Sequence, residues 1–398
     1  MSKIIKPLIR FRGFTDAWEQ RKLGELGTTY TGISGKTSSD FGHGDARFIT
    51  YMNVYSNAIA NPLMVEPIEI DQKQNEVKVG DVFFTTSSET PDEVGMSSVL
   101  LEKQGTVYLN SFCFGYRPKE KIDLHYLAFM LRSEVVRKKI IFLAQGISRY
   151  NISKNKMMEI SVPLPTIKEQ SKIGGFLNNL DNLITLHQRK YEKLKNIKQS
   201  MLGKMFPKNG EKFPEIRFKG FTDAWEQRKL SDFLTVSKLK NNDEVFNKEH
   251  VLSVSGEYGI VNQIEFQGRS FAGVSVANYG VVETGDIVYT KSPLKSNPYG
   301  IIKTNKGKPG IVSTLYAVYK PKDNTAPEFV QTYFEQDARM NNYMHPLVNK
   351  GAKNDMKVSA ENALKGLVIF PCKKEQLKIS EFFANLDNLI TLHQRKRS

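Results

Sequence analysis

Hydrophobic residues follow a helical spacing in two long stretches of this chain. Between residues 167 and 205 they recur every three or four positions, which predicts one helix of roughly 58 Å with a coiled-coil stripe. From Lys374 onward the same stripe returns over a shorter stretch. Because neither helix can bury its stripe alone, we expect the two to pair as an antiparallel coiled coil under pseudo-two-fold symmetry. The residues predicted to pair are Ile173, Leu177, Leu180, Ile184, His187, Ile379, Phe383, Leu386, Ile390 and His393.

The first long helix has a start signal and an internal conflict. Thr166 follows a Pro-Leu-Pro stop and precedes Glu169 by three positions, the spacing of a capping box. Gly174 and Gly175 then cost the helix on the order of 1 kcal/mol each. Close approach of another backbone would offset that cost, and a kink at the two glycines is equally compatible with the sequence.

The segments outside these helices read as mixed α/β. Stretches 81–86, 106–117, 287–290 and 310–319 are rich in β-branched and aromatic residues between Gly, Pro and Asp, which predicts strands. A helical spacing covers residues 122–144 and, more weakly, its counterpart at 326–343. The predicted fold class is therefore mixed α/β (α+β), with two globular domains separated by two long helices.

The chain is a tandem repeat. Residues 9–23 and 216–230 differ at one position only, and residues 179–190 return unchanged at 385–396. The centres between these blocks share only a faint apolar skeleton. The repeated blocks form a constant frame around divergent centres, an arrangement suited to presenting two different surfaces in one geometry. Neutral drift of loop-rich domains is the alternative. Trp18 and Trp225, which belong to the repeated openings, are expected to anchor each domain on the frame.

Composition narrows the class of protein. A hydrophobic share of 40% excludes disorder of the whole chain, and no apolar run is long enough for a membrane helix. The two distant cysteines, Cys113 and Cys372, fit a reducing cytoplasm and form no structural zinc motif. The net charge of +15 points to a polyanionic partner, most simply nucleic acid.

Motifs for catalysis or cofactor binding are weak. The first glycine of a Walker A motif ending at Thr37 would fall on Tyr30, so residues 32–37 read as a polar loop. The stretch 297–299 lacks the second proline of an amino-methyltransferase motif, and the six histidines show no metal spacing. We therefore expect no catalytic, cofactor-binding or metal-binding residue in this chain.

Polar segments that follow the predicted strands are the candidates for contact with DNA. Each half has one such segment after a strand and a second turn rich in Arg, Lys or Asn. Such side chains hold phosphates or read base edges, and solvated surface loops are the alternative interpretation. The candidates are Lys36, Thr85, Thr86, Ser87, Ser88, Arg149, Tyr150 and Asn151 in the first half, and Thr290, Lys291, Ser292, Lys295, Lys350, Lys353 and Asn354 in the second.

Both long helices open with a shared motif. Pro165 is followed by Glu169-Gln170 and Ile173, and Pro371 by Glu375-Gln376 and Ile379. Together with the repeated FTDAWEQRKL openings and the doubled organisation, this motif resembles the specificity subunit of type I restriction–modification enzymes. The resemblance covers essentially the whole chain. It implies a first target-recognition domain at 1–162, a central helix at 163–206, a linker at 207–215, a second target-recognition domain at 216–370 and a shortened C-terminal helix at 371–398.

The resemblance also implies a function. Such a subunit has no catalytic activity and recognises a bipartite, asymmetric sequence of double-stranded DNA. It docks two methyltransferase subunits and, through them, the motor-nuclease subunits, and S-adenosylmethionine, ATP and Mg²⁺ are expected in those partners. Two alternatives stay open: a self-contained DNA-modifying enzyme, and a non-catalytic coiled-coil scaffold that joins two protein partners.

Overall fold

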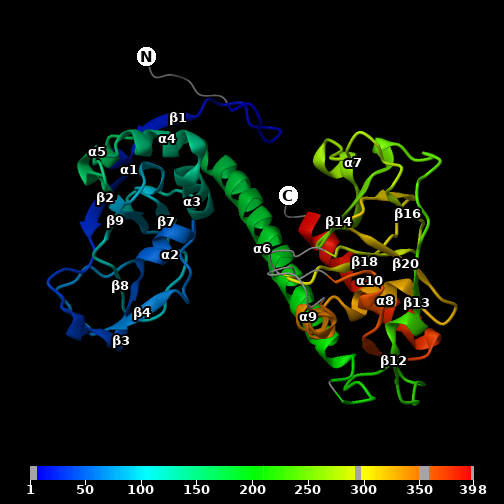
Figure 1. Cartoon of the computed structure of the whole chain (residues 1–398). Coiled ribbons are helices and arrows are strands. Elements are labelled where there is room, and N and C mark those ends of the chain that lie inside the picture. The colour runs from blue at the N-terminus through cyan, green and yellow to red at the C-terminus, as the bar shows by residue number, and fades with distance from the viewer. Residues whose placement is uncertain (1–6, 209, 292–296, 349–357, 396–398) are drawn as a thin grey trace. The chain divides into compact units, whose positions relative to one another are not determined.

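The chain folds into two units. A computed structural model describes residues 7–208, 210–291, 297–348 and 358–395 (Figure 1). The units comprise Met1–Thr185 and Leu186–Ser398, and each contains a mixed α/β domain. The predicted fold class, two mixed α/β domains and two long helices, is confirmed.

The first unit is built around a four-stranded antiparallel sheet in the order β2-β9-β5-β7. Phe84, Phe114 and Tyr116 of this sheet pack under helix α3 in the main core. A second sheet has the order β4-β3-β8, and the pairs β1-β11 and β6-β10 complete the unit. The elements are β1 Glu19–Lys22, α1 Leu23–Leu26, β2 Gly27–Thr31, β3 Phe41–Ile49, α2 Tyr51–Ser56, β4 Val65–Ile68, β5 Val82–Thr85, β6 Ser87–Ser88, β7 Ser97–Val99, β8 Val107–Leu109, β9 Cys113–Pro118, α3 Leu124–Arg132, α4 Glu134–Phe142, β10 Tyr150–Asn151, α5 Lys154–Met158 and β11 Ser161–Leu164.

The second unit repeats the four-stranded sheet, in the order β13-β20-β17-β18, and surrounds it differently. The hairpin β14-β15 and the pair β16-β19 cover one face, and β12 pairs with β21 as β1 pairs with β11. The elements are β12 Glu226–Lys229, β13 Leu234–Val236, β14 Leu252–Ser255, β15 Gly259–Asn262, α7 Gln263–Gln267, β16 Gly280–Val282, β17 Ile287–Tyr289, β18 Ile302–Thr304, β19 Gly310–Val312, β20 Ala317–Pro321, α8 Pro327–Tyr333, α9 Asp337–Met344 and β21 Leu367–Phe370.

Four stretches predicted as single elements are each two elements in the structure, and in the second unit these are 326–343, which is α8 and α9, and 310–319, which is β19 and β20. The stretch predicted as one helix at 122–144 is two helices, because Ser133 adopts an extended backbone with ψ of 149° and its hydroxyl donates to the carbonyl of Met130. The stretch predicted as one strand at 106–117 is likewise two strands, β8 and β9, separated by a turn in which Asn110 accepts from the backbone of Phe112. In the first unit, a polar residue whose side chain bonds to the backbone, Ser133 or Asn110, marks the interruption.

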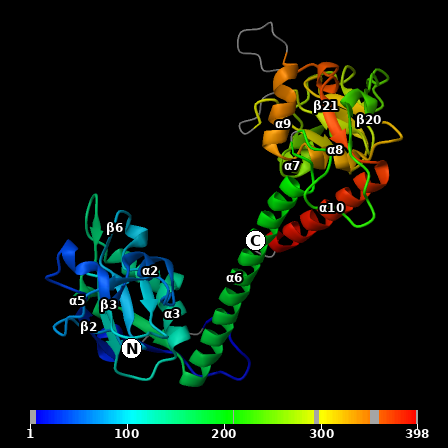
Figure 2. The same cartoon turned by 90° about the horizontal axis from the view of Figure 1, so that it is seen from below.

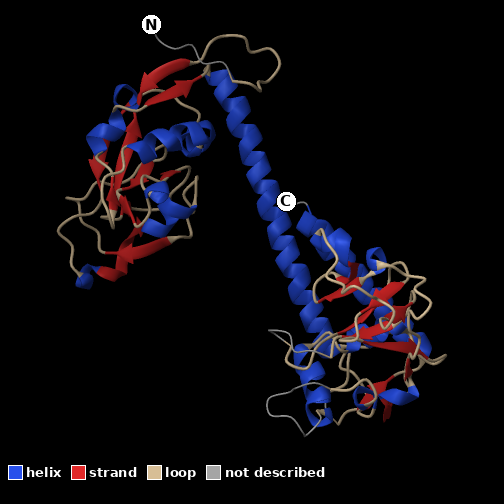
Figure 3. Ribbon diagram, turned by 45° about the horizontal axis from the view of Figure 1, so that its top comes forward, coloured by secondary structure: helices blue, strands red, loops and turns tan. Residues whose placement is uncertain are grey.

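The long helices form as predicted. Helix α6 runs over Ile167–Lys204 and α10 over Lys373–Arg395 (Figure 3). Within the second unit, α10 lies antiparallel to the C-terminal half of α6 (Figure 2), and the Nδ1 atoms of His187 and His393 are 3.0 Å apart. These two histidines are duplicates of one another. Contact between equivalent residues is what two-fold pairing of the helices requires.

The predicted partners of α10 are corrected. Its residues Ile379, Phe383 and Leu386 are buried in the core of the second domain, which also takes Leu194 and Leu202 from the tail of α6. In the first copy, Ile173 packs instead on the core of its own domain, and Leu180 and Ile184 are 41% and 45% exposed. The first apolar residues of each long helix therefore pack on the domain that precedes that helix. The spacing of apolar residues alone could not show which partner they contact. The remaining positions predicted to pair, Leu177 and Ile390, are half-buried.

The glycine conflict in α6 is resolved by close packing. A Cβ atom on Gly174 would lie 2.5 Å from the backbone nitrogen of Tyr126 and 2.6 Å from Oδ1 of Asp123, at the start of α3. Gly175 has open space around it. Gly174 is therefore the position at which α3 meets α6, and close approach of another backbone explains it.

Candidate nucleic-acid interface

Two candidate segments of the first unit, distant in sequence, form one β-ribbon. β6 pairs with β10 so that Tyr150 lies opposite Ser88 and Asn151 opposite Ser87. The backbone nitrogen of Ile152 donates to the carbonyl of Thr86 at 3.0 Å and extends the ribbon. The structure thus brings together the strand-end segment and the Arg-bearing turn that the sequence had placed only as separate loops.

The turn that carries Arg149 depends on a glycine. Gly146 has φ of +145°, and a Cβ atom there would lie 2.0 Å from the carbonyl oxygen of Arg149. This close approach lets Gln145 and Asn151 exchange two backbone hydrogen bonds, of 3.0 and 2.9 Å. Any side chain at Gly146 would open the turn and move Arg149.

A surface hollow lies beside this ribbon. Helix α2 contributes two stacked tyrosines, Tyr51 and Tyr55, whose ring centroids are 6.1 Å apart. Met52 and Phe112 are 53% and 57% exposed at its edge. The lining residues are Tyr51, Met52, Tyr55, Ser87, Ser88, Glu89, Glu93, Phe112, Ser148 and Arg149. Sequence reasoning missed α2 and Phe112; the aromatic-rich run YMNVYS at 51–56 was the available signal.

Hydrogen bonds fix the ribbon in place. The Tyr51 hydroxyl donates to the carbonyl of Ser87 at 2.9 Å. Glu93 accepts from the Tyr55 hydroxyl at 2.5 Å and from the Ser88 hydroxyl at 3.2 Å. The bond from Tyr55 lowers the pKa of Glu93, and the same bond to a carboxylate raises the pKa of Tyr55. Glu93 is therefore an ionised acceptor that positions its neighbours.

Several candidates of the first unit have structural roles. Thr85 is fully buried, and its hydroxyl accepts from the backbone nitrogen of Met96 at 3.0 Å. Thr86 donates to the carbonyl of Phe112. Ser87 and Ser88 are buried and hold Arg149 and Glu93. Since a buried, bonded hydroxyl has no surface to offer DNA, we withdraw Thr85 as a contact and treat the two serines as positioning residues.

Lys36 is also withdrawn as a contact. Its Nζ atom lies 3.1 Å from Oδ2 of Asp71 and 3.6 Å from Oδ1 of Asp40. The hydrogen bond to Asp71, ahead of the other causes, raises the pKa of Lys36. Two carboxylates neutralise this lysine, so it cannot attract a phosphate as a free cation would. Arg149 and Asn151 are exposed, Tyr150 is half-buried, and their contact with DNA stays a prediction.

In the second unit the equivalent strand end repeats one of these roles. Thr290 is 4% exposed, and its hydroxyl accepts from the backbone nitrogen of Ile301 at 2.9 Å, as Thr85 does from Met96. Thr290 is therefore withdrawn as well. The Nζ atom of Lys291 donates to the carbonyl of Thr314 at 2.7 Å. The remaining candidates, Ser292, Lys295, Lys350, Lys353 and Asn354, lie outside the described residues.

The Glu-Gln motif of each long helix fastens the repeated opening to that helix. Arg10 binds Glu169 through Nε and Nη2 at 2.6 and 2.7 Å, and Arg217 binds Glu375 through the same atoms, both at 2.7 Å. The expected capping box is thus replaced by a bidentate ion pair with a residue far away in sequence. Gln170 and Gln376 each donate to the carbonyl of the motif's proline, at 2.9 Å in both copies.

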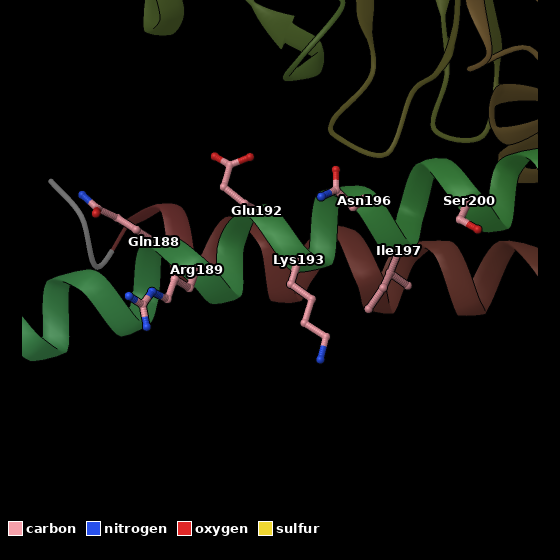
Figure 4. A pocket seen from close by; sticks show the side chains of 7 residues that line it. All are labelled: Gln188, Arg189, Glu192, Lys193, Asn196, Ile197 and Ser200. Atoms are coloured by element: carbon pink, nitrogen blue, oxygen red, sulfur yellow. The ribbon is translucent and has the colours of Figure 1, made fainter. Parts of the chain in front are cut away.

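A shallow groove runs along the outside of α6 in the second unit. Its lining residues all come from this one helix (Figure 4), and Ile197 is the apolar member among Gln188, Arg189, Glu192, Lys193, Asn196, Ile197 and Ser200. Charges of both signs along one helix face are typical of a solvated surface. We assign no ligand to this groove.

The described residues contain no group of three or more His, Cys, Asp and Glu side chains arranged to hold a metal ion. Within the same residues, no helix combines the length and the apolar character needed to cross a membrane. The first unit brings together a hollow, a hydrogen-bonded ribbon and exposed charged side chains, which suit contact with another macromolecule.

Comparison with known proteins points to one family. A family model described as the type I restriction modification DNA specificity domain matches residues 15–196. The EcoKI specificity subunit of Escherichia coli (strain K12) is 22% identical over 348 residues, which cover 82% of this chain and 73% of that protein. The MjaVIII specificity subunit of Methanocaldococcus jannaschii is 30% identical over 83 residues, which cover 21% of this chain and only 20% of that protein.

A solved structure shares the fold. The S subunit of a type I restriction–modification system from M. genitalium superposes with a TM-score of 0.58 at 12% identity. The superposition covers 99% of this chain and 95% of that one. At this identity the similarity concerns the fold alone.

Proposed function

We propose that this chain, which belongs to the specificity-subunit family of type I restriction–modification enzymes, selects the DNA sequence on which such an enzyme acts. Each of its two domains reads one part of a bipartite target in double-stranded DNA. Because the two reading surfaces differ, the two parts of the target differ as well, and the whole target is asymmetric.

One observation carries this proposal: the same frame contacts hold two different surfaces. The ion pairs Arg10–Glu169 and Arg217–Glu375 repeat with the same atoms, and so does the threonine bond at the end of each central strand. The segments between these repeated contacts differ: the first unit has helix α2 and its hollow, whereas the second has the hairpin β14-β15 and helix α7. A net charge of +15 favours a polyanionic ligand for such surfaces.

The chemical steps belong to partner subunits in this proposal. This chain is non-catalytic, and two methyltransferase subunits dock on it, with the motor-nuclease subunits attached through them. S-adenosylmethionine, ATP and Mg²⁺ bind in those partners. The supporting observation is that the sequence holds neither a complete methyltransferase motif nor a Walker A motif.

The test is to map DNA methylation in cells that carry this chain with its methyltransferase partner. We expect one methylated motif with two defined parts separated by several unread base pairs, and we expect it to vanish when this chain alone is deleted. Copurification should recover the methyltransferase with this chain. A scaffold without DNA preference would leave the methylated motif unchanged on deletion, and a continuous motif would contradict two separate readers.

A further inference from the structure

Two charges of opposite sign lie at the same end of the ribbon in the first unit. Glu89 directly follows β6, and Arg149 directly precedes β10. The ladder ends at Ser88 and Tyr150, and extending its antiparallel register by one position places Glu89 across from Arg149. Opposed residues of such a ladder have Cβ atoms about 5 Å apart. Both residues line the hollow and both are exposed.

Neither charge is neutralised by the described part of the chain. Arg149 donates one hydrogen bond, from Nη2 to the hydroxyl oxygen of Ser87 at 3.1 Å. The described residues give Arg149 and Glu89 no ion pair, whether with each other or with a third group. The guanidinium therefore keeps most of its five N–H donors free, and the carboxylate keeps both oxygens free as acceptors.

A carboxylate is an unusual group to present to DNA. Phosphates repel it, so on a DNA-binding surface it is best placed where it accepts a hydrogen bond from a base. In the major groove, glutamate accepts from the exocyclic amine of cytosine, and arginine donates two bonds to O6 and N7 of guanine. Guanine and cytosine present these groups side by side when they pair with each other.

We propose that the hollow of the first domain reads one G·C base pair through its major-groove edge, with Arg149 on the guanine and Glu89 on the cytosine. This inference rests on the proposed function, since it requires DNA to reach the hollow. It assigns to two named residues one position of the half-site that the first domain reads.

The surroundings suit this reading. The bonds from Tyr51 to Ser87 and from Ser88 to Glu93 hold the ribbon before any ligand arrives. The exposed side chains of Met52 and Phe112 border the hollow and would exclude water from the bonds to the base pair. In a drier site these charge-assisted bonds discriminate more strongly between bases.

The experiment compares Arg149→Ala and Glu89→Gln with Lys138→Ala, each in the full complex with its methyltransferase partner. Lys138 is an exposed control in the same domain, paired to Glu134 within α4. Methylation rates are measured on duplexes that carry the wild-type target or a single base-pair change at each position. We expect both hollow variants to lose discrimination at the same G·C pair, by roughly ten- to a hundredfold, and to leave the other half-site unchanged.

Each outcome decides the proposal. Unchanged discrimination in both variants, effects at two different positions, or an affected pair other than G·C would overturn it. The unaffected second half-site shows that a variant complex is folded and assembled. If the wild-type complex recognises no bipartite target, the proposed function fails; if it does and the hollow variants keep its specificity, only the G·C assignment fails.

Discussion

The two halves of this molecule are alike where the chain repeats itself and unlike where it does not. The strand pairs β1-β11 and β12-β21 have the same register, with Glu19 opposite Leu164 and Glu226 opposite Phe370. The same arginine, glutamate and glutamine positions close each opening onto its helix. The repeated sequence thus encodes the contacts that attach each domain to its long helix. Those contacts do not constrain the surface of the domain, which can differ between the halves.

The halves also differ in how many helices support them. The second domain is packed against two, because the tail of α6 adds Leu194 and Leu202 to the core that α10 enters, and Phe206, which follows α6, joins the same core. Arg339 of this domain stacks on the ring of Phe206 at 4.6 Å and donates to the carbonyl of Leu202. Among the described residues, the long helices contribute one flanking residue to the main core of the first domain, Ile173 near the start of α6. The same frame contacts therefore occur in two domains whose cores are packed differently against the long helices.

The largest effect on the recognised DNA sequence is expected from exchanging the surface of the second domain. Replacing the segment between Leu230 and Pro371 by the corresponding segment of another family member should change one part of the target completely and spare the other. The reason is that the frame contacts on both sides of the exchanged segment are retained. Mapping of the methylated motif gives the readout, and a change in both parts would contradict independent reading.

The frame itself can be broken through its ion pair. The carboxylate of Glu375 is 1% exposed, so Glu375→Gln leaves Arg217 with a neutral partner in a buried place. We expect a loss of about 3 kcal/mol in the unfolding free energy of the second domain. Glu169→Gln should act in the same direction on the first domain. Hydrogen exchange resolved by domain measures both, and equal destabilisation of both domains by either variant would argue against separate attachments.

The support from the tail of α6 rests partly on Lys198. Its Nζ atom lies 2.5 Å from Glu335 of the second domain and 2.6 Å from Asp387 of α10. Because both carboxylates are partly exposed, we expect Lys198→Met to destabilise the second domain by only about 1–2 kcal/mol, and less at high salt. Lys195→Met, on an exposed position of the same helix, is the control. Chemical unfolding at two salt concentrations would show whether the ion pairs or the methionine packing dominate.

The smallest effect distinguishes the two tryptophans. Trp18 donates from Nε1 to Glu169 at 3.2 Å, whereas Nε1 of the buried Trp225 has no hydrogen-bond partner among the described residues. Trp18→Phe should cost about 1 kcal/mol through the lost bond. Trp225→Phe should be close to neutral, since removal of an unsatisfied donor offsets the lost packing. Thermal unfolding of the two variants gives the comparison; a larger loss for Trp225→Phe would mean that packing outweighs the donor.

Much of the architecture could be predicted from the sequence alone. The duplicated blocks are found by comparing the sequence with itself. The spacing of apolar residues every three or four positions is a local property of α6 and α10. The central strands β5 and β17 and the polar segments after them were predictable for the same reason. The Arg149 turn was predicted as a candidate, although its neighbours were not.

Tertiary structure decided which residues those local elements meet. The stripe of α10 turns to the second domain and the tail of α6, Glu169 binds Arg10 across most of the first domain's sequence, and α2 comes to lie beside the Arg149 turn. Helical period and turn chemistry act over a few neighbouring residues. The burial of apolar surface and the pairing of buried charges depend on partners that only the folded chain brings within contact distance.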